Sequence, residues 1–232
     1  MKKIIVQDNL FDLFPDFYRG LIIVKNIDNR PINDVIENLL KKQLENSHIN
    51  SLAEEPRLLS WDGVHRKFGS NPNKFPPSIK SLLKRINKKP QLPFINSVVA
   101  LFNYISIKYC LPCGGDDVDT IQGNLVLGIA NGSESFRALG STKIENPNDG
   151  EVIYFDDANK NVMCRRWNWR NGDDTKIDVN SKHIVINIDC LPPISPEIGI
   201  SARDELADLL ESHCSAELST GHLSNDCREY EI

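Results

Sequence analysis

The spacing of hydrophobic residues predicts three helices in the first half of the chain. Apolar side chains recur three and four positions apart over 32–40, 79–86 and 95–102, which is the period of a helix that buries one face. In the second range, lysines stand opposite the apolar positions and are expected to face solvent. The third range predicts a core helix that ends at Pro112 and leads into a glycine-rich, acidic loop over 113–119.

Short apolar or alternating runs predict strands. They lie at 4–6, 21–24, 125–130, 152–155, 162–169 and 183–188. Asparagine, aspartate and glycine between the later runs favour hairpin turns and antiparallel pairing. Helices early in the chain and strands late in it are typical of an α+β fold, so we predict mostly antiparallel sheet layers with flanking helices. Residues 47–73 show no clear period, and no element is predicted there.

The chain is long enough, at 232 residues, for one domain with a substantial core. Prolines from Pro192 to Pro196 are expected to end that domain, which gives a single domain over 1–196. The remaining segment, 197–232, is predicted to form one helix over 203–212 and a frayed acidic tail. No apolar run reaches the roughly 18 residues that a membrane span needs. We therefore expect a soluble, cytoplasmic protein.

The charges are distributed unevenly along the chain. The net charge is −5, but residues 197–232 hold nine acidic and two basic side chains, which leaves the rest of the chain at +2. From Gly63 to Gly115 there is no acidic residue, and nine lysines and arginines occur. This asymmetry predicts either a surface for a polyanion or a lysine-rich helix that simply faces solvent.

Cysteine and histidine spacing argues against a metal site. Cys110 and Cys113 form a single Cys-x-x-Cys pair, and the other four cysteines are scattered, so a second pair for zinc is lacking. The five histidines show no metal-ligand spacing. Free, mostly buried thiols are expected in a reducing compartment. We predict neither a metal nor a cofactor.

A series of short motifs in the middle of the chain resembles a known family. The motifs are Leu-Pro-Phe-Ile-Asn-Ser-Val-Val at 92–99, Asn-Tyr at 103–104, Leu-Pro at 111–112 and Asp-Val-Asp at 117–119. Pro-Pro-Ser at 76–78, Gly-Glu-Val-Ile-Tyr at 150–154 and Arg-Arg-Trp-Asn-Trp-Arg at 165–170 extend the match. In order and spacing they resemble the B3/B4 domain of the phenylalanyl-tRNA synthetase β-subunit, over a motif core of about residues 60–190.

The resemblance implies a stand-alone editing enzyme that hydrolyses the ester of a mischarged tRNA. It implies that Asn103 orients the attacking water or the carbonyl group. The substrate-binding residues would be Asp116, Asp117, Trp167, Asn168 and Trp169. The residues that contact the tRNA would be Lys80, Lys84, Arg85, Lys88, Arg166 and Arg170. The implied partners are the acceptor end of an aminoacyl-tRNA and, as a further candidate, a tRNA synthetase.

Other interpretations of the same residues stay open. A strand period of two would place Arg165, Trp167 and Trp169 on one face and Arg166, Asn168 and Arg170 on the other. The indoles beside arginines also suit a packed cation–π cluster. The aspartates of 116–119 also suit turn and helix-cap positions. Gly114 stands where the synthetase domain carries a histidine, which favours a non-catalytic module that binds aminoacyl-tRNA, an amino acid or a nucleotide. An adaptor that acts through the acidic tail is a third alternative.

Overall fold

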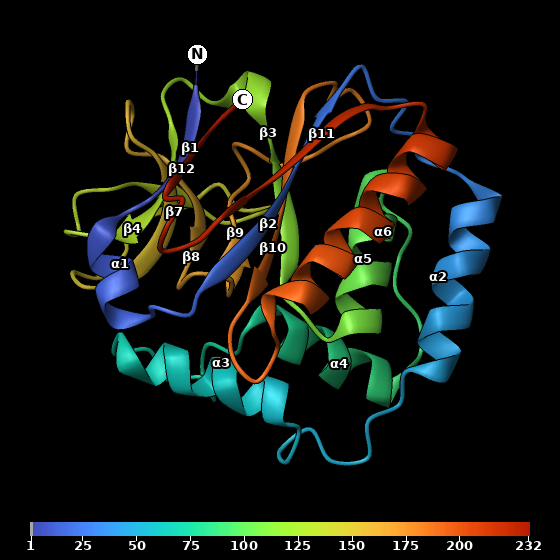
Figure 1. Ribbon diagram of the computed structural model, residues 1–232, viewed down its shortest axis with the longest axis horizontal. Helices are drawn as coiled ribbons and strands as arrows, with labels where there is room; N and C mark the ends of the chain where they lie inside the picture. The colour runs from blue at the N-terminus through green and yellow to red at the C-terminus, as the bar shows by residue number, and fades with distance from the viewer. Residues whose placement is uncertain (1) are drawn as a thin grey trace.

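Two β-sheets and the helices around them form the fold of residues 2–232, which the computed structural model describes (Figure 1). The helices are α1 (Asp8–Leu13), α2 (Asp34–Asn46), α3 (Pro56–Lys67), α4 (Ser78–Lys88), α5 (Ser97–Tyr109) and α6 (Pro196–Cys214), with a short 3₁₀ turn η1 (Val118–Thr120). Helices α2, α4 and α5 confirm the three periodic stretches of the first half.

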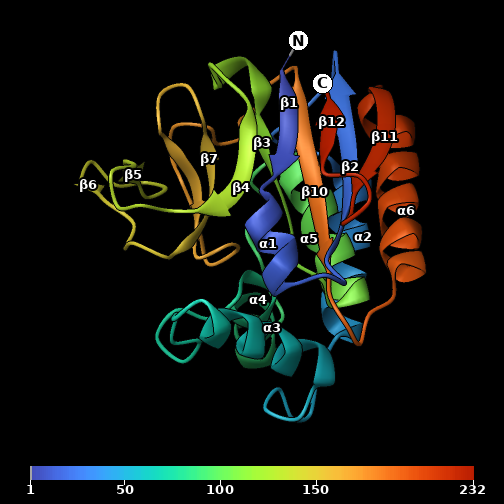
Figure 2. The ribbon, with the colours of Figure 1, turned by 60° about the vertical axis from the view of Figure 1, so that its left-hand side comes forward.

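The larger sheet has the strand order β12-β1-β4-β7-β8-β9. Its strands are β1 (Lys3–Val6), β4 (Leu125–Ile129), β7 (Val152–Asp156), β8 (Val162–Arg165), β9 (Arg170–Asn171) and β12 (Glu229–Glu231). The smaller sheet has the order β11-β2-β10-β3, from β2 (Tyr18–Lys25), β3 (Cys113–Asp117), β10 (Ile184–Cys190) and β11 (Glu217–Leu223). A hairpin of β5 (Phe136–Arg137) and β6 (Ile144–Glu145) projects to one side (Figure 2).

Antiparallel pairing dominates both sheets, with β1 and β4 as a parallel pair. The predicted α+β class with mostly antiparallel layers is therefore confirmed. None of the helices formed by residues 2–232 combines the length and the apolar character that a membrane crossing needs.

Helices α5 and α6 cover one face of the smaller sheet (Figures 1 and 2). Gly20 of β2 permits this close packing, because a Cβ atom at that position would lie 3.3 Å from Cβ of Arg203 in α6. Neighbouring residues of a strand face opposite ways. Arg19 therefore projects from the other face of the sheet, toward the larger sheet.

The acidic segment after residue 196 completes both sheets. Strand β11 pairs with β2 over seven residues, and β12 pairs with β1. The prediction of a frayed tail is wrong, because backbone hydrogen bonds and the burial of Gly221 and Leu223 hold a segment that is polar in composition. Helix α6 also begins earlier than the predicted helix over 203–212.

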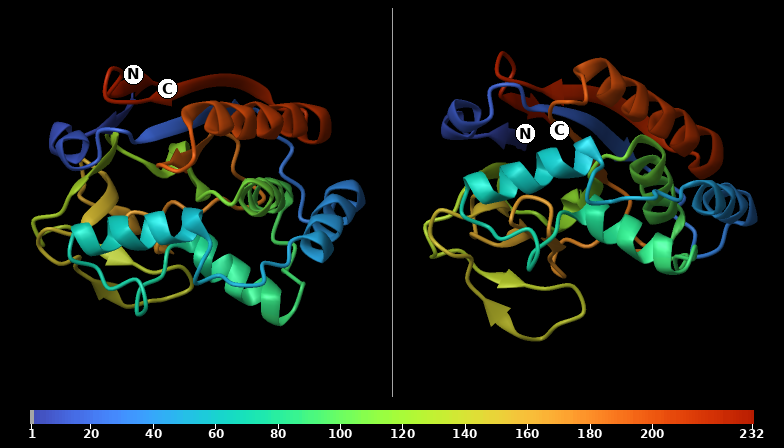
Figure 3. Two further views of the ribbon diagram at one scale, coloured as in Figure 1. Left: turned by 60° about the horizontal axis from the view of Figure 1, so that its bottom comes forward. Right: turned by 90° about the horizontal axis from the view of Figure 1, so that it is seen from below.

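Helix α3 occupies a stretch for which the sequence pattern predicts no element. It lies beside α4 beneath the sheets (Figure 3), and the Asp62 and Lys80 side chains form an ion pair between the two helices. Its buried side carries Asp62 and His65 among apolar residues. These polar residues interrupt the hydrophobic period, so the pattern does not reveal the helix.

Candidate functional site

A polar stripe crosses three strands of the smaller sheet, on the face turned toward the larger sheet. Arg19 of β2 lies directly opposite Asp189 of β10 in the antiparallel register. Asn187 is two residues before Asp189, and Asp116 of β3 is paired with residue 185 of β10. Because alternate residues of a strand share a face, these four polar side chains project from the same side of the sheet.

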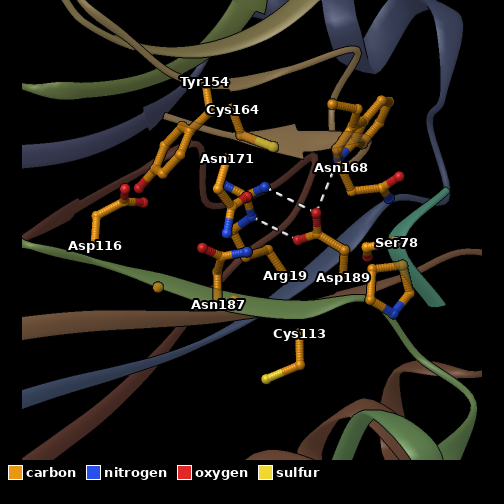
Figure 4. Close-up of a pocket in the computed structure, with 14 residues that line it drawn as sticks. Arg19, Ser78, Cys113, Asp116, Tyr154, Cys164, Asn168, Asn171, Asn187 and Asp189 are labelled. Carbon is orange, nitrogen blue, oxygen red and sulfur yellow. Dashed lines mark hydrogen bonds and ion pairs between the residues drawn. The ribbon is translucent and has the colours of Figure 1, made fainter. Parts of the chain in front are cut away.

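The opposite wall comes from the larger sheet and from the turn that follows β8. Tyr154 of β7, Cys164 of β8, and Trp167 and Asn168 of the turn face the polar stripe. Between the walls lies a cavity of about 60 Å3 (Figure 4). The remaining lining residues are Ser78, Pro112, Cys113, Gly114, Gly115 and Asn171.

Arg19 and Asp189 form a buried ion pair in the cavity wall. Nε and Nη2 of Arg19 donate to the two carboxylate oxygens of Asp189, at 2.6 and 2.9 Å. The indole Nε1 of Trp167 donates to the same carboxylate at 2.8 Å. The guanidinium carbon also lies 5.1 Å from the ring centre of Tyr154. These contacts fix the guanidinium in one orientation before any ligand arrives.

Three buried polar atoms of residues that line the cavity have no hydrogen-bond partner among residues 2–232, namely Nδ2 of Asn168, Nη1 of Arg19 and the hydroxyl of Tyr154. The Arg19 and Tyr154 side chains are 1% and 3% exposed. An unpaired buried donor costs on the order of 1–3 kcal/mol, so native proteins rarely leave two of them together. Burial raises the pKa of Tyr154, and the hydroxyl therefore keeps its proton. The cavity is suited to a polar occupant.

Asp116 contributes a buried carboxyl group at the edge of the cavity. Thr175 donates its hydroxyl to this carboxyl at 2.6 Å. Burial raises the pKa of Asp116 from 3.8 to about 6, although the Thr175 hydrogen bond and the charge of Arg19 act in the opposite direction. In Figure 4 the carboxyl is turned toward the hydroxyl of Tyr154. Asp116 is therefore an acceptor whose charge changes just below neutral pH.

Asp117 and Asp119 do not line the cavity. Asp117 accepts hydrogen bonds from the Ser181 hydroxyl at 2.5 Å and from the backbone N–H of Asp119 at 3.0 Å, and so caps η1. The loop predicted over 113–119 is instead strand β3 followed by η1. Of the two aspartates predicted to bind the substrate, Asp116 lies at the cavity, whereas Asp117 is hydrogen-bonded elsewhere.

Gly115 explains why this stretch forms a strand. A Cβ atom at that position would lie 2.5 Å from the carbonyl oxygen of Val185 in β10. Only glycine therefore allows the two strands to pair at this spacing. At the neighbouring Gly114, a Cβ atom would have no described atom within 4 Å, which leaves space beside Asn187 in the cavity wall.

Asn171, an exposed residue at the end of β9, borders the cavity and two larger hollows. The hollows have volumes of about 480 and 470 Å3. The first shares Gly115 and Asp116 with the cavity, and the second shares Ser78 and Cys113. Cavity and hollows therefore form one branched cleft, in which the cavity is the innermost part.

The larger hollow, here called the apolar hollow, is lined by Ile95, Val99 and Phe102, with Leu139 and Ile177 among the residues facing them. The prediction that Ile95, Val98, Val99 and Phe102 share one core-facing side of a helix is wrong in part. Val98 is fully buried in the core, whereas the other three border the hollow, and Ile95 is 54% exposed.

The second hollow, here called the cationic hollow, brings Asn103 together with Arg85, Trp169 and Arg170. Asn103 is half-buried on α5, Arg85 is exposed on α4, and Arg170 is exposed at the start of β9. These three polar residues and the indole come from segments far apart in the chain. The predicted grouping of the asparagine with a tryptophan and an arginine is therefore present in the fold.

Two of the residues predicted to contact tRNA are buried instead of exposed. The Lys80 ammonium is paired with Asp62 between α3 and α4. The Arg166 guanidinium lies 3.8 Å from the ring centre of Phe75 and 3.4 Å from a carboxylate oxygen of Glu151. Both cations are already engaged within the fold. By contrast, Lys84, Arg85, Lys88 and Arg170 are exposed.

The strand predicted over 162–169 ends early. Strand β8 stops at Arg165, and Arg166 and Trp167 have φ angles of 47° and 64°, in the left-handed region. The expected alternation therefore fails, and the two indoles diverge. Trp169 borders the cationic hollow, whereas Trp167 packs edge-on against Phe14, Phe17 and Trp61.

His65 holds Asn168 in the cavity wall. Its Nε2 lies 3.1 Å from the amide oxygen of Asn168. Burial lowers the pKa of His65 to about 4, so the ring is neutral near pH 7 and Nε2–H donates to that oxygen. The backbone carbonyl oxygen of Asn168 accepts a hydrogen bond from the backbone N–H of Ser78 at 2.8 Å. This bond joins the turn to the start of α4.

Arg19, Tyr154, Asn187 and Asp189 line the cavity but were not among the predicted site residues. A signal was present for two of them, because Arg19 and Asp189 are charged residues within mostly apolar runs. Buried charges of that kind are found when they are paired. The pairing itself was not visible, since 170 positions separate the two residues.

No cluster of metal-binding side chains is present in the described part of the chain. Among residues 2–232, no group of three or more histidine, cysteine, aspartate or glutamate side chains is placed to hold a metal ion. The six cysteines are free thiols.

The protein is thus an α+β domain with a polar cleft between two sheet layers. Comparison with known proteins identifies its family. The family model of the B3/4 domain matches residues 60–215, which is more than half of the chain. The protein belongs to the B3/4 domain family. No curated protein matches the sequence.

Among solved structures, the fold is similar to that of an N-terminal fragment of the phenylalanyl-tRNA synthetase β-subunit from Pyrococcus horikoshii. The TM-score is 0.50 and the sequence identity is 13%. The match covers 93% of this chain and 49% of the other, so this chain spans about half the length of that fragment. The likeness establishes the fold.

Proposed function

We propose that this protein is a stand-alone editing deacylase that hydrolyses the ester of a mischarged aminoacyl-tRNA. The observation that supports this most directly is the branched cleft, in which a small polar cavity adjoins the hollow lined by Asn103, Arg85 and Arg170. An amino acid at the end of a polyanion needs both an enclosed recognition site and a cationic approach. Membership of the B3/4 family and the fold of the synthetase fragment agree with this function.

In this proposal the aminoacyl group enters the cavity and the nucleic acid stays outside it. Asp116 accepts hydrogen bonds from the α-ammonium group, and the amino-acid side chain lies between Tyr154 and Arg19. The ester then lies near Asn171, at the junction of the cavity and the two hollows. Trp169 and the exposed arginines Arg85 and Arg170 border the path of the tRNA end.

The chemistry needs little assistance because an aminoacyl ester is already reactive. The oxygen of a water molecule adds to the ester carbonyl carbon, the bond to the ribose 3′ oxygen breaks, and that oxygen receives the proton. Asn103 would orient the water or polarise the carbonyl, and positioning of this kind lowers the barrier without a strong base. The neighbouring ribose hydroxyl can relay the proton. Neither a metal nor a cofactor takes part in this scheme.

Exposed cations on α4 would hold the acceptor stem. Lys84 and Lys88 flank Arg85 on this helix and are exposed. Contacts between lysine or arginine and phosphate release counterions, so tRNA binding is expected to weaken steeply as salt rises.

The test is a deacylation assay on a panel of tRNAs that each carry a non-cognate amino acid. Wild-type protein should release at least one amino acid catalytically, and Asn103→Ala should reduce its kcat/KM by about 100-fold or more, as loss of one transition-state donor does. Asn38→Ala, an exposed asparagine on α2 outside the cleft, is the matched control. Full activity of Asn103→Ala would remove Asn103 from the site. Absence of release from every tRNA would overturn hydrolysis.

Gly114 favours a second candidate function, a module that binds aminoacyl-tRNA without cleaving it. Glycine itself supplies no side chain at this position that could act as a base. Steeply salt-dependent binding of charged tRNA, with the ester intact after prolonged incubation, would support this alternative over the deacylase.

A further inference from the structure

We propose that the cavity selects a short side chain that carries a hydroxyl group, so that tRNAs bearing serine or threonine are the substrates. This inference rests on the proposed function, which leaves the amino acid open. It is carried by three properties of the cavity: its volume, the unpaired polar atoms of Arg19 and Tyr154 in its wall, and its charge.

The volume restricts the occupant to a few heavy atoms. The cavity measures about 60 Å3, whereas an apolar cavity that holds benzene measures about 150 Å3. A phenyl or phenol ring is therefore too large. The walls cannot easily move apart to admit a larger group, because Trp167 is packed against three aromatic rings and Arg19 is held by Asp189.

The unpaired atoms define the chemistry of the occupant. Nη1 of Arg19 can only donate a hydrogen bond, so its partner must be an acceptor. The hydroxyl of Tyr154 can donate or accept. A hydroxyl group on the ligand can accept a hydrogen bond from Nη1 of Arg19 and form a second hydrogen bond with the hydroxyl of Tyr154. A methyl group in the same place would leave both buried atoms unpaired, and a site of this kind discriminates strongly against the analogue without the hydroxyl.

Charge disfavours acidic side chains. The cavity is bordered by two carboxyl groups, Asp116 and Asp189, and by one guanidinium, Arg19. The guanidinium is already paired with Asp189. In the proposed complex the α-ammonium group pairs with Asp116, so an additional carboxylate would find no unpaired positive charge in the cavity. A neutral hydroxyl needs none.

The decisive comparison is between threonine and valine, which differ by a hydroxyl and a methyl group of similar size. One tRNA is acylated separately with threonine, serine, valine, leucine and phenylalanine, and kcat/KM for release is measured. We expect threonine to be preferred over valine by about 100-fold or more, and leucine and phenylalanine to be released no faster than valine. Equal rates for threonine and valine, or fastest release of phenylalanine, would overturn the inference.

Tyr154→Phe tests whether the cavity wall is the source of the preference. This change keeps the ring and removes an unpaired buried hydroxyl, so the variant should fold. The threonine-to-valine ratio should fall about tenfold or more, through a lower rate for threonine. Tyr109→Phe, whose hydroxyl donates to Glu205 outside the cleft, should leave the ratio unchanged. An unchanged ratio in Tyr154→Phe would contradict the assignment.

A binding measurement separates this inference from the proposed function. Threonyl and valyl groups are attached to 3′-amino-adenosine through an amide, which resists hydrolysis, and calorimetry measures their affinity for wild-type protein. Selective binding of the threonyl compound without deacylation of any tRNA would support the cavity assignment and overturn the deacylase. Equal affinity for the two compounds would overturn the cavity assignment, whether or not tRNA is deacylated.

Discussion

Arg19 and Asp189 face each other across two antiparallel strands and share two hydrogen bonds, at 2.6 and 2.9 Å, with both side chains about 2% exposed. Desolvation of two charges offsets much of their attraction, so such a pair contributes little net stability compared with apolar residues. Its clearer effect is geometric. The pair fixes one nitrogen of Arg19 in the cavity wall with no partner of its own.

Removal of one member of this pair should destabilise the protein strongly. Asp189→Asn keeps a hydrogen-bond acceptor but leaves the Arg19 charge uncompensated in the interior. We expect the free energy of unfolding to fall by about 3–5 kcal/mol, measured by urea denaturation. The control is Glu229→Gln, which breaks an exposed pair with Lys3 and should leave the denaturation midpoint unchanged. A similar midpoint for both variants would show that the buried pair is not needed by the fold.

Asp116→Asn should stabilise the protein near pH 7 and not at pH 4. Burial raises the pKa of Asp116 to about 6 in the folded state, against 3.8 for the ordinary group. Between these values the folded state binds more protons than the unfolded state, so stability falls as pH rises, by up to roughly 3 kcal/mol above pH 6.

The asparagine variant lacks this loss. Its stability gain over wild type, followed by denaturation at several pH values, should appear between pH 4 and pH 6 and stay constant above. A gain that does not change with pH would contradict the raised pKa. Under the proposed function the same variant loses the negative charge that attracts the α-ammonium group, so it should be more stable and less active.

Adjacent glycines in β3 should respond in opposite ways to substitution. Gly115→Ala forces a Cβ atom to 2.5 Å from the Val185 carbonyl oxygen, and the resulting strain should lower the free energy of unfolding by about 1–3 kcal/mol. Gly114→Ala meets no atom within 4 Å among the described residues and should be neutral or slightly stabilising.

A larger side chain at position 114 is expected to fill the cavity. Gly114→Leu should abolish activity or ligand binding while the thermal unfolding midpoint stays within a few degrees of wild type. An active Gly114→Leu protein would place the substrate elsewhere in the cleft.

Substitutions of two lysines on α4 should have different effects, one on stability and the other on nucleic-acid binding. Lys80→Ala leaves Asp62 buried with only Arg66, at 3.9 Å, for compensation, and should cost about 3 kcal/mol of stability. Lys84→Ala, at an exposed position, should not change stability. Under the proposed function it should reduce the slope of log affinity for tRNA against log salt by about 1. A loss of tRNA affinity in Lys80→Ala with unchanged stability would contradict the structural role of that lysine.

Local patterns predicted those parts of the fold that local forces decide. Helices α2 and α4 follow from apolar spacing alone, and β7 and β10 from short apolar runs. Helix α3 was missed because its buried side carries Asp62 and His65. The strand through Trp169 was wrong because the left-handed backbone at Arg166 and Trp167 is set by tertiary packing, which a period of two cannot indicate.

The candidate site shows the same division. Asn103, Asp116, Trp169 and Arg170 were found through motifs, and the structure places all four along the branched cleft. Arg19, Tyr154, Asn187 and Asp189 lie on strands whose roles appear only when the two sheets face each other. Lys80 and Arg166 were misjudged because a helical or strand period does not show which cation has a buried acidic neighbour.

The separation of Arg19 from its partner has a practical consequence for anyone who isolates this domain. The family match spans residues 60–215, and strand β2, which carries Arg19, lies before it. A fragment cut at those limits would keep Asp189 and the motifs but lose the guanidinium and β11, so the sheet would be left open on the β2 side. Such a fragment would retain the motifs by which the family is identified but lack Arg19 from the cavity wall. Its inactivity would therefore not show that the whole protein is inactive.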